Sequence, residues 1–239
     1  MKKFICVLLL IGMVVMLGAC GGGEAVSVDL GQPEATSEPV APEVVLEIRE
    51  LEILEFGYSV RVLSDNYSLY HSIFLYNPNE HVMAMFPSYR ITAFAEDGRI
   101  LGTTESVRDN LLPGSILVWA SSAFRVDEFP ARVEAEIIPL NQHNWVSNFE
   151  AFEPFEIDGA SKNARGDTLG QIINNNSQDF ERAWAVVVYR DENGVLLGGR
   201  SSLVNNIPAM GSTAFSIDRL FNAPDFDGAY SFDVFAFPG

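Results

Sequence analysis

Beyond Val44 the apolar residues of the chain fall in short runs, many of which alternate with polar residues, and Gly, Pro, Asn and Asp interrupt them. Branched and aromatic residues at a period of two, with a turn signal every ~8 to 12 residues, are typical of antiparallel strands. The pattern therefore predicts an all-β chain without long helices. Four of the clearest strands are expected at residues 56–62, 88–95, 115–119 and 133–137.

The same pattern occurs twice, with a spacing of 96 or 97 residues. Asn77-Pro78-Asn79, for example, has a counterpart in Asn174-Asn175-Asn176. Strand, turn and following strand recur in the same order, which indicates an internal duplication. Two copies are too few for a solenoid, whereas ~95 residues is the size of a two-sheet sandwich. We therefore predict two tandem immunoglobulin-like antiparallel β-sandwiches, at residues 43–140 and 146–239.

Turn signals stand in corresponding places of the two copies. Asp97-Gly98 matches Asn193-Gly194, and Pro113-Gly114-Ser115 matches Met210-Gly211-Ser212. Asp-Gly and Asn-Gly tolerate positive φ at both central positions of a type I′ turn, which is the tightest link between antiparallel strands. The sequence thus predicts a two-residue hairpin turn in each copy.

The strand before each of these hairpin turns should place one face in a core. The face that we expect to point inward consists of Tyr89, Ile91, Ala93, Ala185, Val187 and Tyr189. In the second copy the opposite face is apolar as well, because it carries Trp184, Val186 and Val188. We expect another part of the protein to cover that face.

The order of these motifs resembles the FxLYD-type modules of bacterial envelope lipoproteins, which are similar in outline to other immunoglobulin-like sandwiches such as late-embryogenesis-abundant type 2 modules. The residues that carry the resemblance are Asn77, Phe94, Asp97, Gly98, Leu101, Pro113, Gly114, Asn174, Tyr189, Asp191, Gly194, Leu197, Pro208 and Gly211. The first copy departs from the pattern where Ala93-Phe94-Ala95-Glu96 replaces the usual aromatic and Asp arrangement. The resemblance implies a location in the cell envelope and a sandwich shape.

The first residues are typical of a signal for export. Two lysines, an apolar run over residues 4–17 and Gly18-Ala19 precede Cys20. A basic flank, a short apolar segment and small residues before a cleavage site mark a secretory signal, because the run is too short to span a bilayer comfortably. The ending Leu-Gly-Ala-Cys resembles the bacterial lipobox, so residues 1–19 are predicted to be a lipoprotein signal peptide and Cys20 the lipidation site. The alternatives are an ordinary signal peptide whose cysteine is incidental and an uncleaved anchor.

Residues 20–42 are predicted to be the lipidated N-terminus followed by a flexible linker. Gly and Pro recur there among Glu, Ser, Thr and Ala, and no hydrophobic period is present. More than one acyl chain on Cys20 would make the attachment to a membrane stable. We therefore expect an extracytoplasmic protein that is anchored to the bacterial cell membrane by its N-terminal lipid.

Composition narrows the range of partners. The chain has 15 Lys and Arg against 32 Asp and Glu, with a formal net charge of -17, which argues against nucleic acid because binding there depends on neutralising phosphates. Two cysteines exclude a disulfide-dense scaffold and a four-thiolate zinc site. If the signal is removed, Cys20 is the sole remaining cysteine, and stability must come from packing.

Residues for catalysis or metal binding are sparse in the sequence. The three histidines are His71, His81 and His143, and no Gly-x-Ser-x-Gly elbow accompanies them. His71 is expected on the solvent side of a strand, and His81 in a turn. Residues 225–228 copy part of a calcium loop without its closing Glu, and we interpret them as a solvated turn. We therefore predict no catalytic residue, no bound metal and no cofactor.

One stretch between the copies, residues 141–145, fits neither a strand nor a hairpin. Its candidate ligand contacts are Trp145, His143 and Asn144, because an indole beside amides can stack on a sugar and hydrogen-bond its hydroxyls. The alternative is that Trp145 packs into the junction between the two domains.

Two functions from different classes remain open at this point. The first is a lipid-anchored, non-catalytic binding or scaffolding protein of the envelope, whose protein partner adds a strand to a sheet edge or whose partner is a glycan. The second is an extracytoplasmic carbohydrate-binding module or a hydrolase-associated protein that uses surface carboxylates and Trp145.

Overall fold

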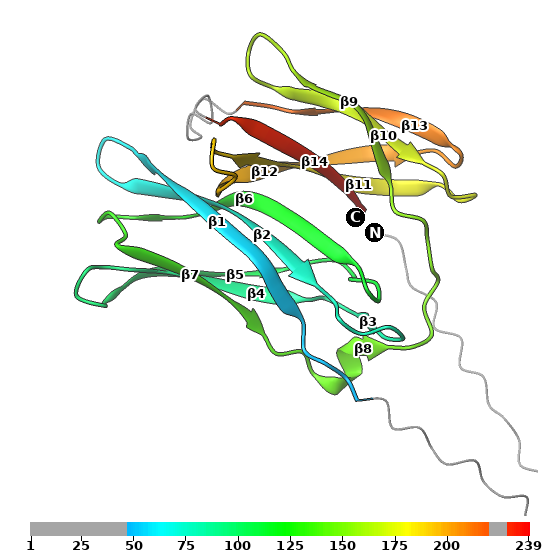
Figure 1. The fold of residues 1–239 in the computed structure, drawn as a ribbon, viewed down its shortest axis with the longest axis horizontal. Helices are drawn as coiled ribbons and strands as arrows, with labels where there is room; N and C mark the ends of the chain where they lie inside the picture. The colour runs from blue at the N-terminus through cyan, green and yellow to red at the C-terminus, as the bar shows by residue number, and fades with distance from the viewer. Residues whose placement is uncertain (1–46, 220–228) are drawn as a thin grey trace, which may run out of the picture. The chain divides into compact units, whose positions relative to one another are not determined.

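Strands dominate the part of the chain that the computed structural model describes, residues 47–219 and 229–239 (Figure 1). The only helix in these ranges is the short 3-10 helix η1 (Gln142–Asn144). The prediction of an all-β chain without long helices is therefore confirmed. Residues 46–239 form one compact unit. The predicted signal peptide, Cys20, the linker and the calcium-like turn at residues 225–228 lie outside the described residues.

The first half of the unit, here called the first module, contains two three-stranded antiparallel sheets. Strand β2 is central in one sheet and β4 is central in the other. The first sheet has the order β1-β2-β6, with β1 (Glu52–Val62), β2 (Tyr67–Tyr76) and β6 (Ile116–Val126). The second has the order β5-β4-β7, with β4 (Ser88–Phe94), β5 (Ile100–Val107) and β7 (Arg132–Ile138). A small ladder joins β3 (Met83–Ala84) to β8 (Trp145–Val146).

The second half, here called the second module, repeats this arrangement. One sheet has the order β13-β10-β9, with β9 (Glu156–Lys162), β10 (Thr168–Asn174) and β13 (Gly211–Ile217). The other has the order β12-β11-β14, with β11 (Phe180–Arg190), β12 (Leu196–Ile207) and β14 (Ser231–Pro238). In both modules two hairpins come first along the chain, one in each sheet. Two further strands follow, and each of them pairs with the middle strand of one sheet. The sequence duplication thus corresponds to a repeated topology.

The hairpin turns differ from the sequence prediction. Gly98 and Gly194 have φ values of 84° and 80°, whereas the residues before them do not have positive φ. In the first hairpin the Gly98 amide donates to the Ala95 carbonyl, and the Ala95 amide donates to the Arg99 carbonyl. This is a three-residue loop with a type I turn and a glycine bulge, so the two-residue type I′ prediction is wrong. The Asp-Gly and Asn-Gly dipeptides therefore predict the position of the glycine with positive φ, but they do not determine the length of the loop.

The predicted core face is confirmed in both modules. All six residues expected to point inward are at most 5% exposed. The opposite face of β11 is buried too, because Val186, Val188 and Leu196 belong to the same apolar cluster as the core of the first module. The expectation that something covers this face is therefore confirmed, and the cover is the β1-β2-β6 sheet.

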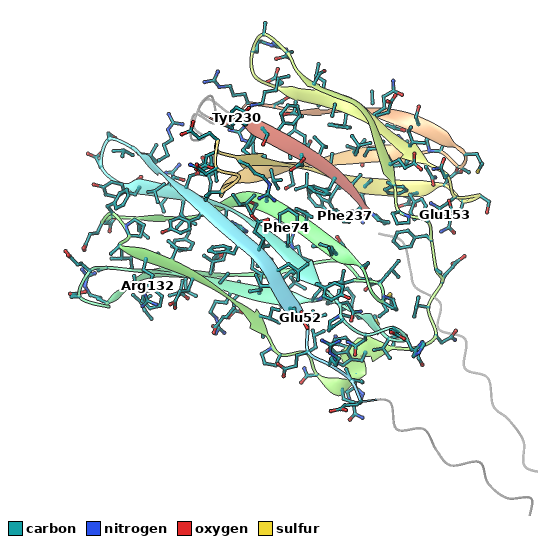
Figure 2. All side chains as sticks on the ribbon, viewed as in Figure 1. Glu52, Phe74, Arg132, Glu153, Tyr230 and Phe237 are labelled. Carbon is teal, nitrogen blue, oxygen red and sulfur yellow. The ribbon has the colours of Figure 1, made fainter. Side chains whose placement is uncertain are left out.

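Aromatic pairs hold the two modules together where these sheets meet. Trp119 and Trp184 pack edge to face with ring centroids 4.8 Å apart, and Phe74 packs in the same way on Phe235 at 5.7 Å. In Figure 2 the labelled Phe74 lies between the β1-β2-β6 sheet and the sheet above it. Edge-to-face pairs contribute about 0.5–1.5 kcal/mol beyond their area burial. Residues 46–239 consequently share a core that runs from one module into the other.

Small residues and one ion pair complete this interface. A Cβ atom at Gly57 of β1 would overlap the Leu196 carbonyl, so the two backbones approach closely only because position 57 is glycine. Beside it the Arg190 guanidinium binds the Glu55 carboxylate with both of its terminal nitrogens, at 2.6 and 2.7 Å. The planar fork of arginine matches a carboxylate in this bidentate geometry.

Candidate functional site

Trp145, the central residue of the predicted ligand contact, is held in place by the β3–β8 ladder. Its Cα partner across the ladder is Ala84, which is fully buried, and the Met85 amide donates to the Asn144 carbonyl at 2.7 Å. The indole is half-buried and packs against the core cluster of the first module. Backbone pairing therefore fixes the base of the side chain while part of the ring stays accessible.

The accessible side of Trp145 lines a cavity of about 310 Å³. The segment just before β1 forms one wall through Ile48, Arg49, Glu50 and Leu51. The end of β7 and the residues that follow it form the other through Ile137, Pro139, Leu140 and Gln142. An aromatic residue, Trp145, and the polar residues Arg49, Glu50 and Gln142 therefore line one space. Such a combination of an aromatic surface with a few polar groups is typical of small-molecule sites.

Arg49 is positioned by the Asn77-Pro78-Asn79 turn. The Asn79 side chain accepts a hydrogen bond from the Arg49 amide and donates one to the Arg49 carbonyl, both at 2.8 Å. Asn77, which is fully buried, in turn accepts hydrogen bonds from the Asn79 amide and side chain and donates to the carbonyls of Val82 and Leu111. The turn thus ties the wall of the cavity to the body of the module. The Arg49 side chain itself is exposed and pairs with Glu52 at 2.9 Å.

The structure separates the three residues predicted to touch a ligand. Trp145 lines the cavity, whereas His143 and Asn144 do not. His143 is exposed in η1, and the carbonyl of Asn144 supports β3. The polar residues that do line the cavity are Arg49, Glu50 and Gln142. Sequence reasoning missed Arg49 because the repeat of Asn-x-Asn indicated a turn, and nothing local indicated which distant segment that turn would hold.

His71 contradicts the sequence prediction, because it lies inside the first module rather than on its solvent side. It is 1% exposed, and its Nε2 forms a hydrogen bond of 2.9 Å with the Tyr89 hydroxyl. Burial, and then the positive charge of Arg108, lower the pKa of His71 to about 3. Burial likewise raises the pKa of Tyr89 to about 12. Both groups are therefore neutral at pH 7. His71 shares its face of β2 with Leu69, Ile73 and Leu75, which belong to the core of the first module. The prediction misplaced it because the opposite face also carries large rings, Tyr70 and Phe74, so that alternation did not distinguish the inner face.

The remaining candidates for chemistry lie on the surface. His81 is exposed, and its nearest acid is Glu80, at 3.8 Å. Within the described ranges, no group of three or more His, Cys, Asp or Glu residues is arranged to hold a metal ion.

The chain was also compared with known proteins. No known protein-family profile matches it, and no curated protein matches it at a significant level. Across residues 47–219 and 229–239, no helix has the length and apolar character needed to cross a bilayer.

Proposed function

We propose that the protein is a lipid-anchored, extracytoplasmic binding or scaffolding protein of the bacterial envelope without catalytic activity, built from FxLYD-type immunoglobulin-like modules. The observation that carries this proposal is the core shared by the two modules, since it joins them into one body with a cavity at Trp145. The cavity wall begins at Ile48, six residues beyond the end of the predicted linker at residue 42. A flexible linker ahead of a folded binding unit suits a protein that presents a site at a distance from a membrane.

The proposed anchor is the lipid on Cys20. Small residues before the cysteine and the basic, apolar segment ahead of it support this assignment. In a bacterial host fed an alkyne fatty acid, the full chain should acquire the label and sediment with membranes. Cys20→Ser should lose both properties, while Cys6→Ser in the signal segment should keep both. Equal labelling of Cys20→Ser and the unchanged chain would refute the anchor.

The partner of the protein is either another envelope protein or a glycan, and the exposed part of the Trp145 ring favours a glycan. Indole rings stack on sugar faces, and the Arg49 guanidinium and Gln142 amide can donate to hydroxyls. The chain, expressed at its native level, should recover a glycan or an envelope protein from solubilised membranes. Trp145→Ala should lower that recovery at least ~tenfold, the loss of about 1.4 kcal/mol of binding, and the neighbouring His143→Ala should not. Recovery of no partner would contradict the binding role.

A further inference from the structure

A second cavity, of about 290 Å³, lies where the two modules meet. The first module contributes Tyr70 and Ser121 to its lining. The second module contributes Arg200, Ser201, Ser202, Ile217 and Asp218. The cavity is separate from the one at Trp145, because the two share no lining residue.

Two glycines bring Arg200 to this place. A Cβ atom at Gly199 would lie 2.9 Å from the Ala120 Cβ, and one at Gly198, where φ is 116°, would lie 3.5 Å from the Tyr70 carbonyl oxygen. Strand β12 therefore lies close against β2 and β6 at these positions. The next residue along β12 is Arg200, which consequently shares a cavity with Tyr70 and Ser121.

Arg200 is a buried cation. It is 8% exposed, and its guanidinium donates to the main-chain carbonyl of Asp218. In the described part of the chain no carboxylate forms an ion pair with it. Burial lowers the pKa of Arg200, as does the nearby Arg219, although Tyr189, Tyr70 and Asp167 act in the opposite direction. Keeping a charge in such a place is costly unless an anion compensates it.

The surroundings of Arg200 are unusually basic for this chain. Arg165 and Arg219 lie at the same end of the second module, and both contact Asp167. The main-chain amide of Arg219 donates to the Asp167 carboxylate, and the Arg165 Nε lies 3.4 Å from an oxygen of that carboxylate. The hydrogen bond from the Arg219 amide, and then that from Asn163, lower the pKa of Asp167, so this carboxylate is ionised. The other acid, Asp218, accepts a hydrogen bond from Ser216. Arg200 and Asp218 are thus the charged residues that line the cavity, and Arg165, Asp167 and Arg219 lie close by. The neighbourhood holds three arginines and two acids, in a chain with about twice as many acids as bases.

We propose that this cavity binds a hydroxylated monocarboxylate, such as a sugar acid. The Arg200 guanidinium would hold the carboxylate, because its donors match the two oxygens of that group. The hydroxyl groups of Tyr70, Ser121, Ser201 and Ser202 can donate to and accept from ligand hydroxyls. A phosphate dianion fits less well, since one buried guanidinium leaves part of its charge uncompensated in a protein of net charge -17. The site does not depend on the lipid anchor or on the Trp145 cavity.

The test is a calorimetric titration of the full chain in detergent with three probes, D-glucuronate, D-glucose and inorganic phosphate. We expect saturable binding of glucuronate, with glucose and phosphate each weaker by ~tenfold or more. Arg200→Gln should weaken glucuronate binding by ~tenfold or more, as expected when a charged hydrogen-bonding partner is lost. Arg99→Gln is the matched control, because this arginine belongs to the first module, does not line the cavity and has a side chain that is 58% exposed, and it should change binding less than ~twofold.

A second variant keeps the test decisive if Arg200→Gln fails to fold, which circular dichroism would show. Ser121→Ala retains the guanidinium and removes one hydroxyl from the first module, and it should weaken glucuronate binding severalfold. No saturable binding of glucuronate, equal binding of glucose, tighter binding of phosphate, or equal losses in Arg99→Gln and Arg200→Gln would each overturn the proposal. An unchanged affinity in Ser121→Ala would also overturn it.

Discussion

The two modules share their strand order and one side-chain network but differ in the polar pair buried beneath it. Asn174 repeats the hydrogen bonds of Asn77: it accepts from the Asn176 amide and side chain, and it donates to the carbonyls of Gln178 and Pro208. Asn176 then clamps the main chain of Glu153, as Asn79 clamps that of Arg49. Because both modules contain this Asn network, we interpret it as part of the structural framework that the modules share.

The buried pair, by contrast, is specific to each module. Six residues before the shared Asn, the first module has His71 against Tyr89, and the second has Thr168 against Tyr189 at 3.3 Å. Only the first pair includes a group, the His71 imidazole, whose ordinary pKa of 6.5 lies near neutral pH and is lowered in the folded protein. The two modules are therefore alike in topology but should differ in their response to pH.

The largest expected effect is the loss of stability in acid through His71. Its folded pKa, about 3, is below its ordinary value of 6.5. The unfolded chain therefore binds more protons between these values, so the contribution of His71 is complete above pH 6.5 and is lost as the pH falls toward 3. At about 1.4 kcal/mol per unit, the free energy of unfolding should drop by roughly 3.5 kcal/mol between pH 6.5 and pH 4. Urea unfolding of the chain from pH 7 to pH 4 measures this slope.

Carboxylates also titrate in that pH range and change the stability. The contribution of His71 is therefore measured as the difference between the pH slopes of the unchanged chain and of a His71 variant. His71→Gln can keep a hydrogen bond to Tyr89 without titrating near neutral pH, and it should flatten the slope. The exposed His81→Gln is the control and should leave the slope unchanged. Parallel slopes for all three proteins would contradict the role of His71.

The next effect is the loss of the shared Asn network. Asn77→Ala leaves the Val82 carbonyl and the Asn79 amide without the side chain that they bind, whereas the Leu111 carbonyl keeps the Ala84 amide. Each buried group without a partner costs about 1–3 kcal/mol. We expect the free energy of unfolding to fall by ~2–4 kcal/mol, and by a similar amount for Asn174→Ala. Asn175→Ala, which removes one exposed bond to Glu156, should cost less than ~0.5 kcal/mol. Thermal unfolding of the three variants compares the modules directly, and a neutral Asn174→Ala would show that the two networks are not equivalent.

Overpacking at the junction should uncouple the modules at a smaller cost. Gly57→Val places side-chain atoms against the Leu196 backbone, which cannot move aside as a side chain can. Such overpacking usually costs about 1–3 kcal/mol. Calorimetry should show one transition for the unchanged chain and a broader or split transition for the variant. Ala214→Val, on the exposed side of β13, adds the same side chain without this contact and should keep the single transition.

The alternation of apolar and polar residues along the chain predicted the strands. The partners of the buried polar side chains depend on contacts between residues far apart in the sequence, and the pattern did not predict them. Alternation placed Tyr89 and Val187 in cores because a period of two depends only on neighbours along the chain. The position of Arg200 depends on β12 lying over β2, and the burial of His71 depends on β2 facing Tyr89 of β4. No local pattern encodes either arrangement. The partners of Asn77 were equally out of reach, because Leu111 lies 34 residues away.

The smallest predicted effect concerns a position where the modules differ by one side chain. The structure aligns Gly114 with Met210, one residue away from the sequence match with Gly211, because their amides donate to the carbonyls of Asn79 and Asn176. Both residues have left-handed backbone, with φ of 63° and 48°.

That conformation costs a residue with a Cβ atom roughly 1 kcal/mol, and Met210 gains little packing in return because it is 72% exposed. Met210→Gly should therefore raise the free energy of unfolding by about 0.5–1 kcal/mol, and Gly114→Ala should lower it by a similar amount, since nothing would contact the added Cβ. Opposite shifts in Tm would establish that backbone strain, and not side-chain contact, distinguishes the two turns. A loss of stability in Met210→Gly would mean that the methionine side chain contributes more than its exposure indicates.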